Sequence, residues 1–191
     1  SNEKISLGKS LRYFGDGFQI SKKIGEKRFW RIPVMDGEFV IEETTGITSA
    51  IGGGNILILG SSKEYVLKAG EIAAKEMGKV ENIILPFPGG IVRSGSKVGS
   101  KYKGLIASTN DAYCPTLQGA TKTNLNNEIE AVLEIVIDGI NEEDIAKTMK
   151  KGIITICKNS NKGIKVISAG NYGGKLGKYH FHLSEIMKWV I

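Results

Sequence analysis

The sequence is poor in the residues that would mark a secreted, membrane-spanning or zinc-binding protein. Its two cysteines, Cys114 and Cys157, form neither a disulfide framework nor a zinc-binding pattern, which fits a reducing cytoplasm. No apolar run approaches the roughly 18 residues of a membrane span. The first residues also lack the apolar core of a signal peptide. We therefore expect a cytoplasmic protein without a membrane partner.

What the chain does contain is typical of a folded domain with a basic surface. With 191 residues, 41% of them hydrophobic and 24% charged, it is long enough to bury about 70% of the surface of its unfolded form. Its 26 Lys and Arg against 20 Asp and Glu give a net charge of +6. This charge favours an anionic partner, and on charge alone nucleic acid, a membrane surface and a polyanionic small molecule all stay open.

Hydrophobic patterning predicts a hairpin followed by two strand–helix–strand units. Asp36-Gly37 is a hairpin signal between the extended stretches 29–34 and 38–42. The elements expected after it are a strand at 55–59, a helix from about 62 to 78 capped by Ser61 and Glu64, strands at 80–85 and 128–137, a helix after Asn141 with Asp144 in its cap, a strand at 165–169 and a final strand at 178–183. This order is that of the ferredoxin-like split βαβ arrangement, so we predict an α+β sandwich.

We expect the whole chain, 1–191, to form one such lobe. The N-terminal hairpin segment covers 11–54, and the core is divided between 55–85 and 128–183. The residues between the two halves of the core, 86–127, form a long insertion. Connectors longer than about 15 residues are usually either functional or disordered.

The first part of the insertion, 86–116, combines hinge glycines with basic and polar side chains. Its charged residues are Arg93, Lys97, Lys101, Lys103 and Asp111, and its hydroxyl and amide groups include Ser108, Thr109 and Asn110. Such a segment can bring backbone amides and cations close to an anionic ligand. A basic, glycine-rich surface loop has the same composition, so both interpretations stay open.

Glu134 is the most informative single residue of the sequence. It lies between branched aliphatic residues of the predicted strand 128–137 and shares a face with Val132 and Val136. A carboxylate is rarely buried without a partner, and burial raises its pKa, which suits a general acid near neutral pH. The alternative is an edge strand whose middle residue faces water. We favour the functional interpretation, because buried acids concentrate at functional sites.

Other patterns in the chain carry weaker signals. His180 and His182 alternate onto one face of the predicted last strand, but no third metal ligand lies near them in the sequence. Cys114 would need an activating base to act as a nucleophile, so we expect a structural thiol. The loop at 95–97 lacks the spacing of a Walker A motif, and the predicted central strands lack the aromatic residues of an RNA-recognition sheet. We therefore expect no metal, and these absences weaken the case for a nucleic-acid partner.

Several blocks of the sequence resemble, in the same order, those of formylmethanofuran:tetrahydromethanopterin formyltransferase. The matching blocks lie at 13–19, 37–39, 86–92 (PFPGGIV), 96–101, 108–116 (STNDAYCPT), 134–137 and 167–177 (ISAGNYGGKLG). The resemblance runs from about Leu11 to Leu183 and is to the C-terminal, or distal, lobe. Family members carry a further N-terminal lobe of comparable size, so the chain is either one lobe or a shortened homologue.

The resemblance implies an enzyme that moves a formyl group from formylmethanofuran to N5 of tetrahydromethanopterin, in the one-carbon metabolism of methanogens and related organisms. It also implies a homo-oligomer without a metal or a tightly bound cofactor, with methanofuran and tetrahydromethanopterin as coenzyme substrates. Glu134 matches a glutamate of the family that acts near the transferred formyl group. Both coenzymes are polyanionic, which gives the basic insertion a ligand.

We predict Glu134 as the catalytic residue, a neutral acid that supplies a proton or a hydrogen bond during formyl transfer. The predicted substrate-binding residues are Arg93, Lys97, Lys101, Ser108, Thr109, Asn110, Tyr113, Asn171 and Lys175. Among them, Lys97 and Lys101 are expected to hold carboxylate or phosphate groups. Two other functions stay open: a non-catalytic coenzyme-binding or assembly module of the same family, and a basic nucleic-acid binder.

Overall fold

The computed structural model describes residues 3–93, 96–159, 163–170 and 177–188. The chain divides into two compact units, Ser1–Ser49 and Ala50–Ile191. The boundary lies just before the strand that begins at Ile51, so Ile51 to Gly54 belong to a core strand and not to the N-terminal segment in which we had placed them. That the two units together form one lobe stays a prediction.

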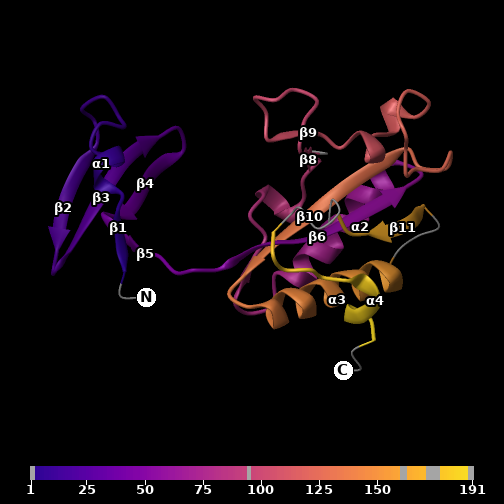
Figure 1. Cartoon of the computed structure of the whole chain (residues 1–191). Helices are drawn as coiled ribbons and strands as arrows, with labels where there is room; N and C mark the ends of the chain where they lie inside the picture. The colour runs from indigo at the N-terminus through magenta and orange to yellow at the C-terminus, as the bar shows by residue number, and fades with distance from the viewer. Residues whose placement is uncertain (1–2, 94–95, 160–162, 171–176, 189–191) are drawn as a thin grey trace. The chain divides into compact units, whose positions relative to one another are not determined.

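Unit 1, Ser1–Ser49, contains the predicted hairpin within a three-stranded antiparallel sheet (Figure 1). Its elements are β1 Lys4–Ser6, α1 Gly8–Leu11, β2 Ile20–Ile24, β3 Lys27–Val34, β4 Gly37–Glu42 and β5 Thr44–Gly46. Val34 pairs with Gly37, which confirms the turn at Asp36-Gly37. Trp30 and Ile32 alternate onto one face of β3 and form the small buried centre of this unit.

Unit 2, Ala50–Ile191, is built on a four-stranded sheet in the order β11-β6-β10-β7, with every neighbouring pair antiparallel. The strand bounds are Ile51–Gly60 for β6, Ile83–Ile84 for β7, Ala131–Gly139 for β10 and Ile164–Ser168 for β11. The predicted mixture of helices and strands is confirmed. The predicted strand at 80–85 keeps only two residues, because Asn82 takes a left-handed turn conformation with φ of 61° immediately before β7.

Two helices, α2 Lys63–Met77 and α3 Glu142–Asn159, cover one face of this sheet. The strand residues that face them, Ile56, Ile58, Ile135 and Ile137, are fully buried, as the period-two alternation of a strand requires. The helices approach closely at Gly152, where a Cβ atom would lie 2.5 Å from Met77 Sδ. This packing occupies one face of the sheet and leaves the other for the insertion.

The first residues of the two helices confirm one predicted cap and correct the other. Asn141 caps α3 as predicted, because its Oδ1 accepts the Asp144 backbone N–H at 2.8 Å while its Nδ2 donates to Asp144 Oδ2. The cap of α2 was predicted one residue too early. Ser62 Oγ, not Ser61, accepts a backbone N–H of the first turn, from Tyr65 at 3.3 Å, whereas Ser61 Oγ donates to the Gly163 carbonyl.

The remaining described elements are short. They are η1 Pro88–Gly90, β8 Ser96–Val98, β9 Ala107–Thr109, η2 Asp111–Tyr113, η3 Pro115–Leu117 and α4 Leu183–Ile186. The predicted final strand at 178–183 is wrong: residues 177–182 have no strand pairing, and Tyr179 and Phe181 instead pack their rings against the main core before α4 begins. None of the helices in the described ranges is both long and apolar enough to cross a bilayer.

Candidate active site

Glu134 lies in the middle of an interior strand, on the sheet face away from the two helices. On one side of β10 it is paired with Leu57 of β6. On the other side its backbone exchanges two hydrogen bonds of 2.8 Å with Val92, which joins the insertion to the sheet. The alternative of a water-facing residue on an edge strand is therefore wrong, and the Glu134 side chain is half-buried.

The carboxyl group of Glu134 is held by Asn55, a residue that we had regarded only as the first of a buried strand. Asn55 Nδ2 donates to Glu134 Oε1 at 2.9 Å, and Asn55 Oδ1 accepts the Gly170 backbone N–H at 2.9 Å. Asn55 is only 5% exposed. A small cavity of about 30 Å³ beside it is lined by Gly53, Asn55, Met149, Ala169, Gly170, Tyr179 and Phe181. The site thus joins β6, β10 and the chain that follows β11.

Burial raises the pKa of the Glu134 carboxyl group above its ordinary value, and the hydrogen bond from Asn55 partly opposes that rise. No charged side chain of the described residues contributes to the shift. The raised pKa favours the neutral acid, which can donate a proton or a hydrogen bond where an ionised carboxylate cannot. This is the property that the sequence led us to expect of Glu134.

We expect the free energy of unfolding to fall as the pH rises through the folded-state pKa of Glu134. The folded chain holds this proton more tightly than the unfolded chain does, so the stabilisation is complete below the unfolded pKa, about 4.3, and is lost above it. Urea unfolding of the wild type and Glu134→Gln should show the stability gap moving in favour of the glutamine variant as the pH increases. A gap that does not change with pH would contradict a raised pKa.

Two glycines bring the insertion back onto the sheet beside Glu134. Gly89 and Gly90 both have left-handed backbone conformations, with φ of 67° and 77°. Gly90 also packs against α2, where a Cβ atom would lie 2.9 Å from Ala74 Cβ and 3.0 Å from Leu85 Cδ1. The chain then leaves in an extended conformation through Ile91, and Val92 pairs with Glu134. The PFPGGIV block therefore pairs directly with the strand that carries the acid.

The second half of the insertion covers the same sheet face next to Glu134. Leu125, together with Ile129 just after the insertion, is buried against Leu57 and Leu59, and Tyr113 packs on this cluster with Val132. Val132 is two residues before Glu134 and shares its face of the strand. Tyr113 is thus a predicted binding residue that packs on the same sheet face as Glu134.

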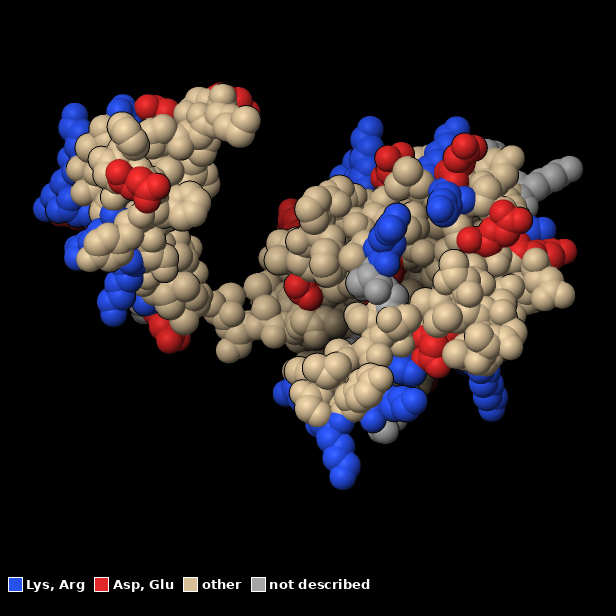
Figure 2. Space-filling model, turned by 90° about the horizontal axis from the view of Figure 1, so that it is seen from above, with Lys and Arg blue, Asp and Glu red and all other residues tan. Residues whose placement is uncertain are grey.

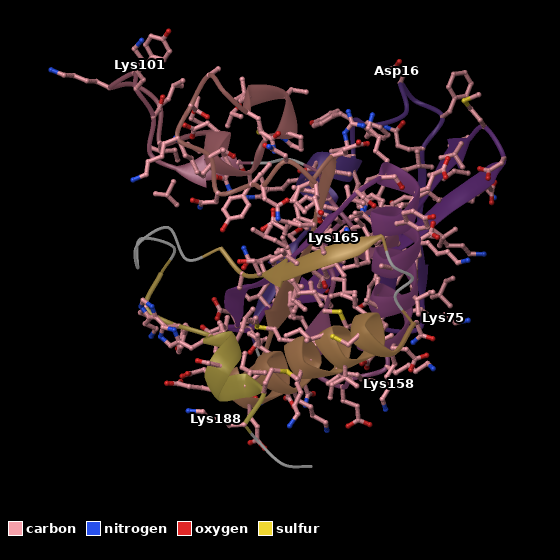
Figure 3. The ribbon with its side chains drawn as sticks, turned by 90° about the vertical axis from the view of Figure 1, so that its right-hand side faces the viewer. Asp16, Lys75, Lys101, Lys158, Lys165 and Lys188 are labelled. Atoms are coloured by element: carbon pink, nitrogen blue, oxygen red, sulfur yellow. The ribbon has the colours of Figure 1, made fainter. Side chains whose placement is uncertain are left out.

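The predicted basic residues are spread along the insertion. Lys97 and Ser108 face each other in the β8–β9 pair, and Lys97 Nζ contacts Asp111 Oδ1. This contact holds the pKa of Asp111 below its usual range. Lys101 is exposed in the loop between β8 and β9, and its side chain extends away from the body of the unit (Figure 3). The structure therefore leaves the Lys101 side chain exposed to solvent, whereas the charge of Lys97 already has a carboxylate beside it.

The other predicted binding residues differ in exposure. Arg93, next to Val92, and Thr109 are exposed, Ser108 is half-buried, and Asn110 is buried with its carbonyl accepting the Tyr113 N–H. The predictions for Asn171 and Lys175 lie outside the described residues. Cys114 is half-buried and Cys157 exposed.

The histidines show no metal geometry. The rings of His180 and His182 stack with their centroids 6.3 Å apart. Across the part of the chain that the structure describes, no group of three or more His, Cys, Asp or Glu side chains is placed to hold a metal ion. The two histidines lie in the segment that leads into α4.

The missed residue, Asn55, had one signal in the sequence. It is the only polar side chain of Asn55-Ile56-Leu57-Ile58-Leu59, an otherwise apolar strand. A buried amide needs partners, which pointed to a polar neighbour but not to its identity. Glu134 is 79 positions away along the chain, and only the register of β6 with β10 brings the two together.

Comparison with known proteins shows the family to which this chain belongs. Residues 37–186 match a family model described as "FTR, proximal lobe", and residues 1–34 match one described as formylmethanofuran-tetrahydromethanopterin formyltransferase. The chain belongs to the formylmethanofuran–tetrahydromethanopterin formyltransferase family. The predicted family is confirmed, but the matched portion is the proximal lobe, so our label of it as the distal lobe is wrong.

Curated relatives and solved structures agree with this assignment. A formylmethanofuran–tetrahydromethanopterin formyltransferase of Methylococcus capsulatus is 64% identical over 97% of this chain and 62% of its own length, and that of Methanocaldococcus jannaschii is 42% identical over 98% and 63%. The formyltransferase structure from Methanosarcina barkeri superposes with a TM-score of 0.72 at 42% identity, covering 97% of this chain and 63% of the other. The chain thus spans about three fifths of the length of these relatives.

A further solved structure includes a ligand. The formyltransferase/hydrolase complex of Methylorubrum extorquens, determined with methylofuran, superposes with a TM-score of 0.71 at 46% identity. It too is matched over 97% of this chain and 63% of its own.

Proposed function

We propose that the protein containing this chain transfers a formyl group from formylmethanofuran to N5 of tetrahydromethanopterin, with Glu134 as the acid. The single observation that carries this is the half-buried Glu134 carboxyl group, held by Asn55 in an interior strand of a chain from this family. The names of the relatives and of the solved structures support the reaction and its two coenzymes.

The reaction needs an acid near the formyl carbon, where one amine nitrogen is exchanged for another. The N5 amine attacks the formyl carbon, a C–N bond forms, and the carbonyl oxygen gains negative charge. The bond to the methanofuran nitrogen then breaks, while one proton leaves N5 and one reaches the departing amine. A neutral Glu134 supplies either the hydrogen bond to the oxygen or the proton to the departing amine, and its raised pKa favours that neutral form.

We propose that the basic insertion binds the anionic groups of a coenzyme, chiefly through its exposed Lys and Arg side chains. On the face of unit 2 seen in Figure 2, basic side chains (blue) and acidic side chains (red) are interspersed. That pattern suits a few point contacts with a small polyanion better than the continuous basic surface that nucleic acid requires. Arg93 and Lys101, both exposed, are the residues of the insertion that we propose for such contacts.

Lys101→Gln in the full-length protein should weaken coenzyme binding by about fivefold at low salt, the ratio that corresponds to roughly 1 kcal/mol for an exposed charge pair. The difference should shrink as salt is added, because exposed charges are screened over about 10 Å at 0.1 M ionic strength. Isothermal titration at two salt concentrations measures it. Lys147→Gln, an exposed lysine of α3 on the helix layer, is the matched control and should change nothing. Equal effects of the two variants would refute a specific role for Lys101.

Three finer expectations accompany this function. The strand order β11-β6-β10-β7 with α2 and α3 on one face supports a ferredoxin-like lobe. The multi-subunit name of the Methylorubrum extorquens structure supports assembly of the natural protein, for which we propose a homo-oligomer. We further propose a cytoplasmic location and no tightly bound cofactor, since both coenzymes enter and leave as substrates.

The test is formyl transfer by the full-length natural protein, with ¹³C-formylmethanofuran and tetrahydromethanopterin as substrates and mass spectrometry of the products. The proposal expects the label on the pterin. Because this chain is shorter than its relatives, the same assay on residues 1–191 alone separates the second candidate, a binding module of the same family. Binding of a coenzyme by the natural protein without transfer would favour that candidate and overturn the enzyme assignment.

A further inference from the structure

Asn55 makes the only side-chain hydrogen bond between the Glu134 carboxyl group and the rest of the described chain. It is buried, and each end of its amide group has one partner: Glu134 at the nitrogen and Gly170 at the oxygen. Both contacts are 2.9 Å long, an ordinary hydrogen-bond distance. The residue therefore connects the acid to the chain that leaves β11.

The Gly170 contact decides which way the Asn55 amide group points. A backbone N–H can only donate, so its partner on Asn55 must be the oxygen, an acceptor. The Asn55 nitrogen, which can only donate, then faces Glu134 Oε1. Turning the amide over would set donor against donor at Gly170 in a buried place, which is costly.

From this polarity we infer that Asn55 is a positioning residue that keeps the proton of neutral Glu134 on Oε2. Oε1 already accepts a hydrogen bond from Asn55, and in a neutral carboxyl group the carbonyl oxygen is a better acceptor than the hydroxyl oxygen, so the proton is favoured on Oε2. The acidic hydrogen is thereby held on the one oxygen that Asn55 leaves open to a reacting group. The hydrogen bonds decide which oxygen carries the proton; the role of that proton in catalysis rests on the proposed function.

Other titratable groups do not account for this arrangement. The elements packed around Glu134 carry Arg93 beside its backbone partner, Tyr113 on its sheet face, Asp138 on its own strand and Tyr179 at the Asn55 cavity. None of these four is among the causes of the Glu134 pKa shift, which are burial and Asn55. Asn55 is therefore the residue to change.

The direction of the hydrogen bond from Asn55 to Glu134 can be tested in this chain with Asn55→Asp, first alone and then combined with Glu134→Gln. Aspartate has the shape of asparagine and still accepts from Gly170, but when ionised it offers Glu134 an acceptor in place of a donor. In Asn55→Asp we expect Glu134 to titrate at higher pH than in the wild type, by ¹³C NMR of labelled glutamate, and the urea midpoint to fall as the pH rises. Adding Glu134→Gln should restore the midpoint, since the Gln amide can turn and donate to the aspartate.

Two results would overturn the inference. One is a Glu134 titration that is the same in Asn55→Asp, Asn55→Leu and the wild type. The other is a double variant whose urea midpoint falls with rising pH as much as that of Asn55→Asp alone. Ile58→Val, a buried change on the opposite face of β6, controls for general loss of stability and should leave the Glu134 titration unmoved.

An activity measurement then connects the proton to catalysis. In the full-length protein, Asn55→Leu should lower kcat about tenfold or more with little change in KM, and shift the pH dependence of kcat with the Glu134 titration. If the titrations change as expected but the natural protein transfers no formyl group, the positioning stands and the proposed function fails. If transfer proceeds and Asn55→Leu changes neither its rate nor its pH profile, the catalytic meaning of Asn55 fails.

Discussion

Glu134→Gln in the full-length protein is expected to lower kcat by about 100-fold or more, the usual contribution of a positioned general acid. Glutamine has the same shape, and its carbonyl oxygen can still accept the Asn55 N–H group, so the strand and its pairing should be kept. What it cannot do is give up a proton. We therefore expect the loss in kcat, while the KM values of both coenzymes change little.

Glu130→Gln is the matched control for this experiment. Glu130 is exposed immediately before β10, so the same chemical change there should leave kcat unaltered. Circular dichroism and the urea midpoint confirm that both variants are folded. A Glu134→Gln enzyme that keeps its kcat would refute the role of the acid, and an equal loss in Glu130→Gln would show that the effect is not specific to the site.

Gly90→Ala is expected to destabilise this chain by about 2–5 kcal/mol. A left-handed backbone conformation costs an alanine about 1–2 kcal/mol, and forcing a methyl group into a packed place adds about 1–3. Both apply at Gly90, where φ is 77° and Ala74 Cβ would lie 2.9 Å from the new atom. Urea unfolding of the two forms measures the difference.

The neighbouring Gly89 provides the control, because it shares the backbone conformation without the crowding. Its φ is 67°, and no atom lies within 4 Å of the place where a Cβ would be. Gly89→Ala should therefore cost only the backbone contribution, about 1–2 kcal/mol. Equal losses in the two variants would mean that the contact with α2 carries no strain. Since Val92 follows two residues later and pairs with Glu134, Gly90→Ala should also disturb the Glu134 titration.

The parts of the fold that rest on local patterns were predictable from the sequence. The period of the apolar residues gave the positions of α2 and α3, and Asp36-Gly37 gave the hairpin, because these signals act between residues close in the chain. Glu134 was recognised for a similar reason, as a carboxylate inside an apolar strand.

What the sequence did not reveal depends on contacts between distant residues. The hydrogen bond from Asn55 to Glu134 needs the register of two strands separated by α2 and the whole insertion. The segment 178–182 alternates like a strand, yet Tyr179 and Phe181 pack against the core without strand pairing. The contact of Lys97 with Asp111 similarly depends on how the β8–β9 pair places the chain that follows it.

The most direct test of the central claim is a single-turnover experiment on the full-length protein with ¹³C-formylmethanofuran bound and tetrahydromethanopterin added. The wild type should pass the label to the pterin, and Glu134→Gln, with both coenzymes shown to be bound, should do so about 100-fold more slowly or worse. Transfer at equal rates in the two proteins would contradict the claim that Glu134 is the acid of this site.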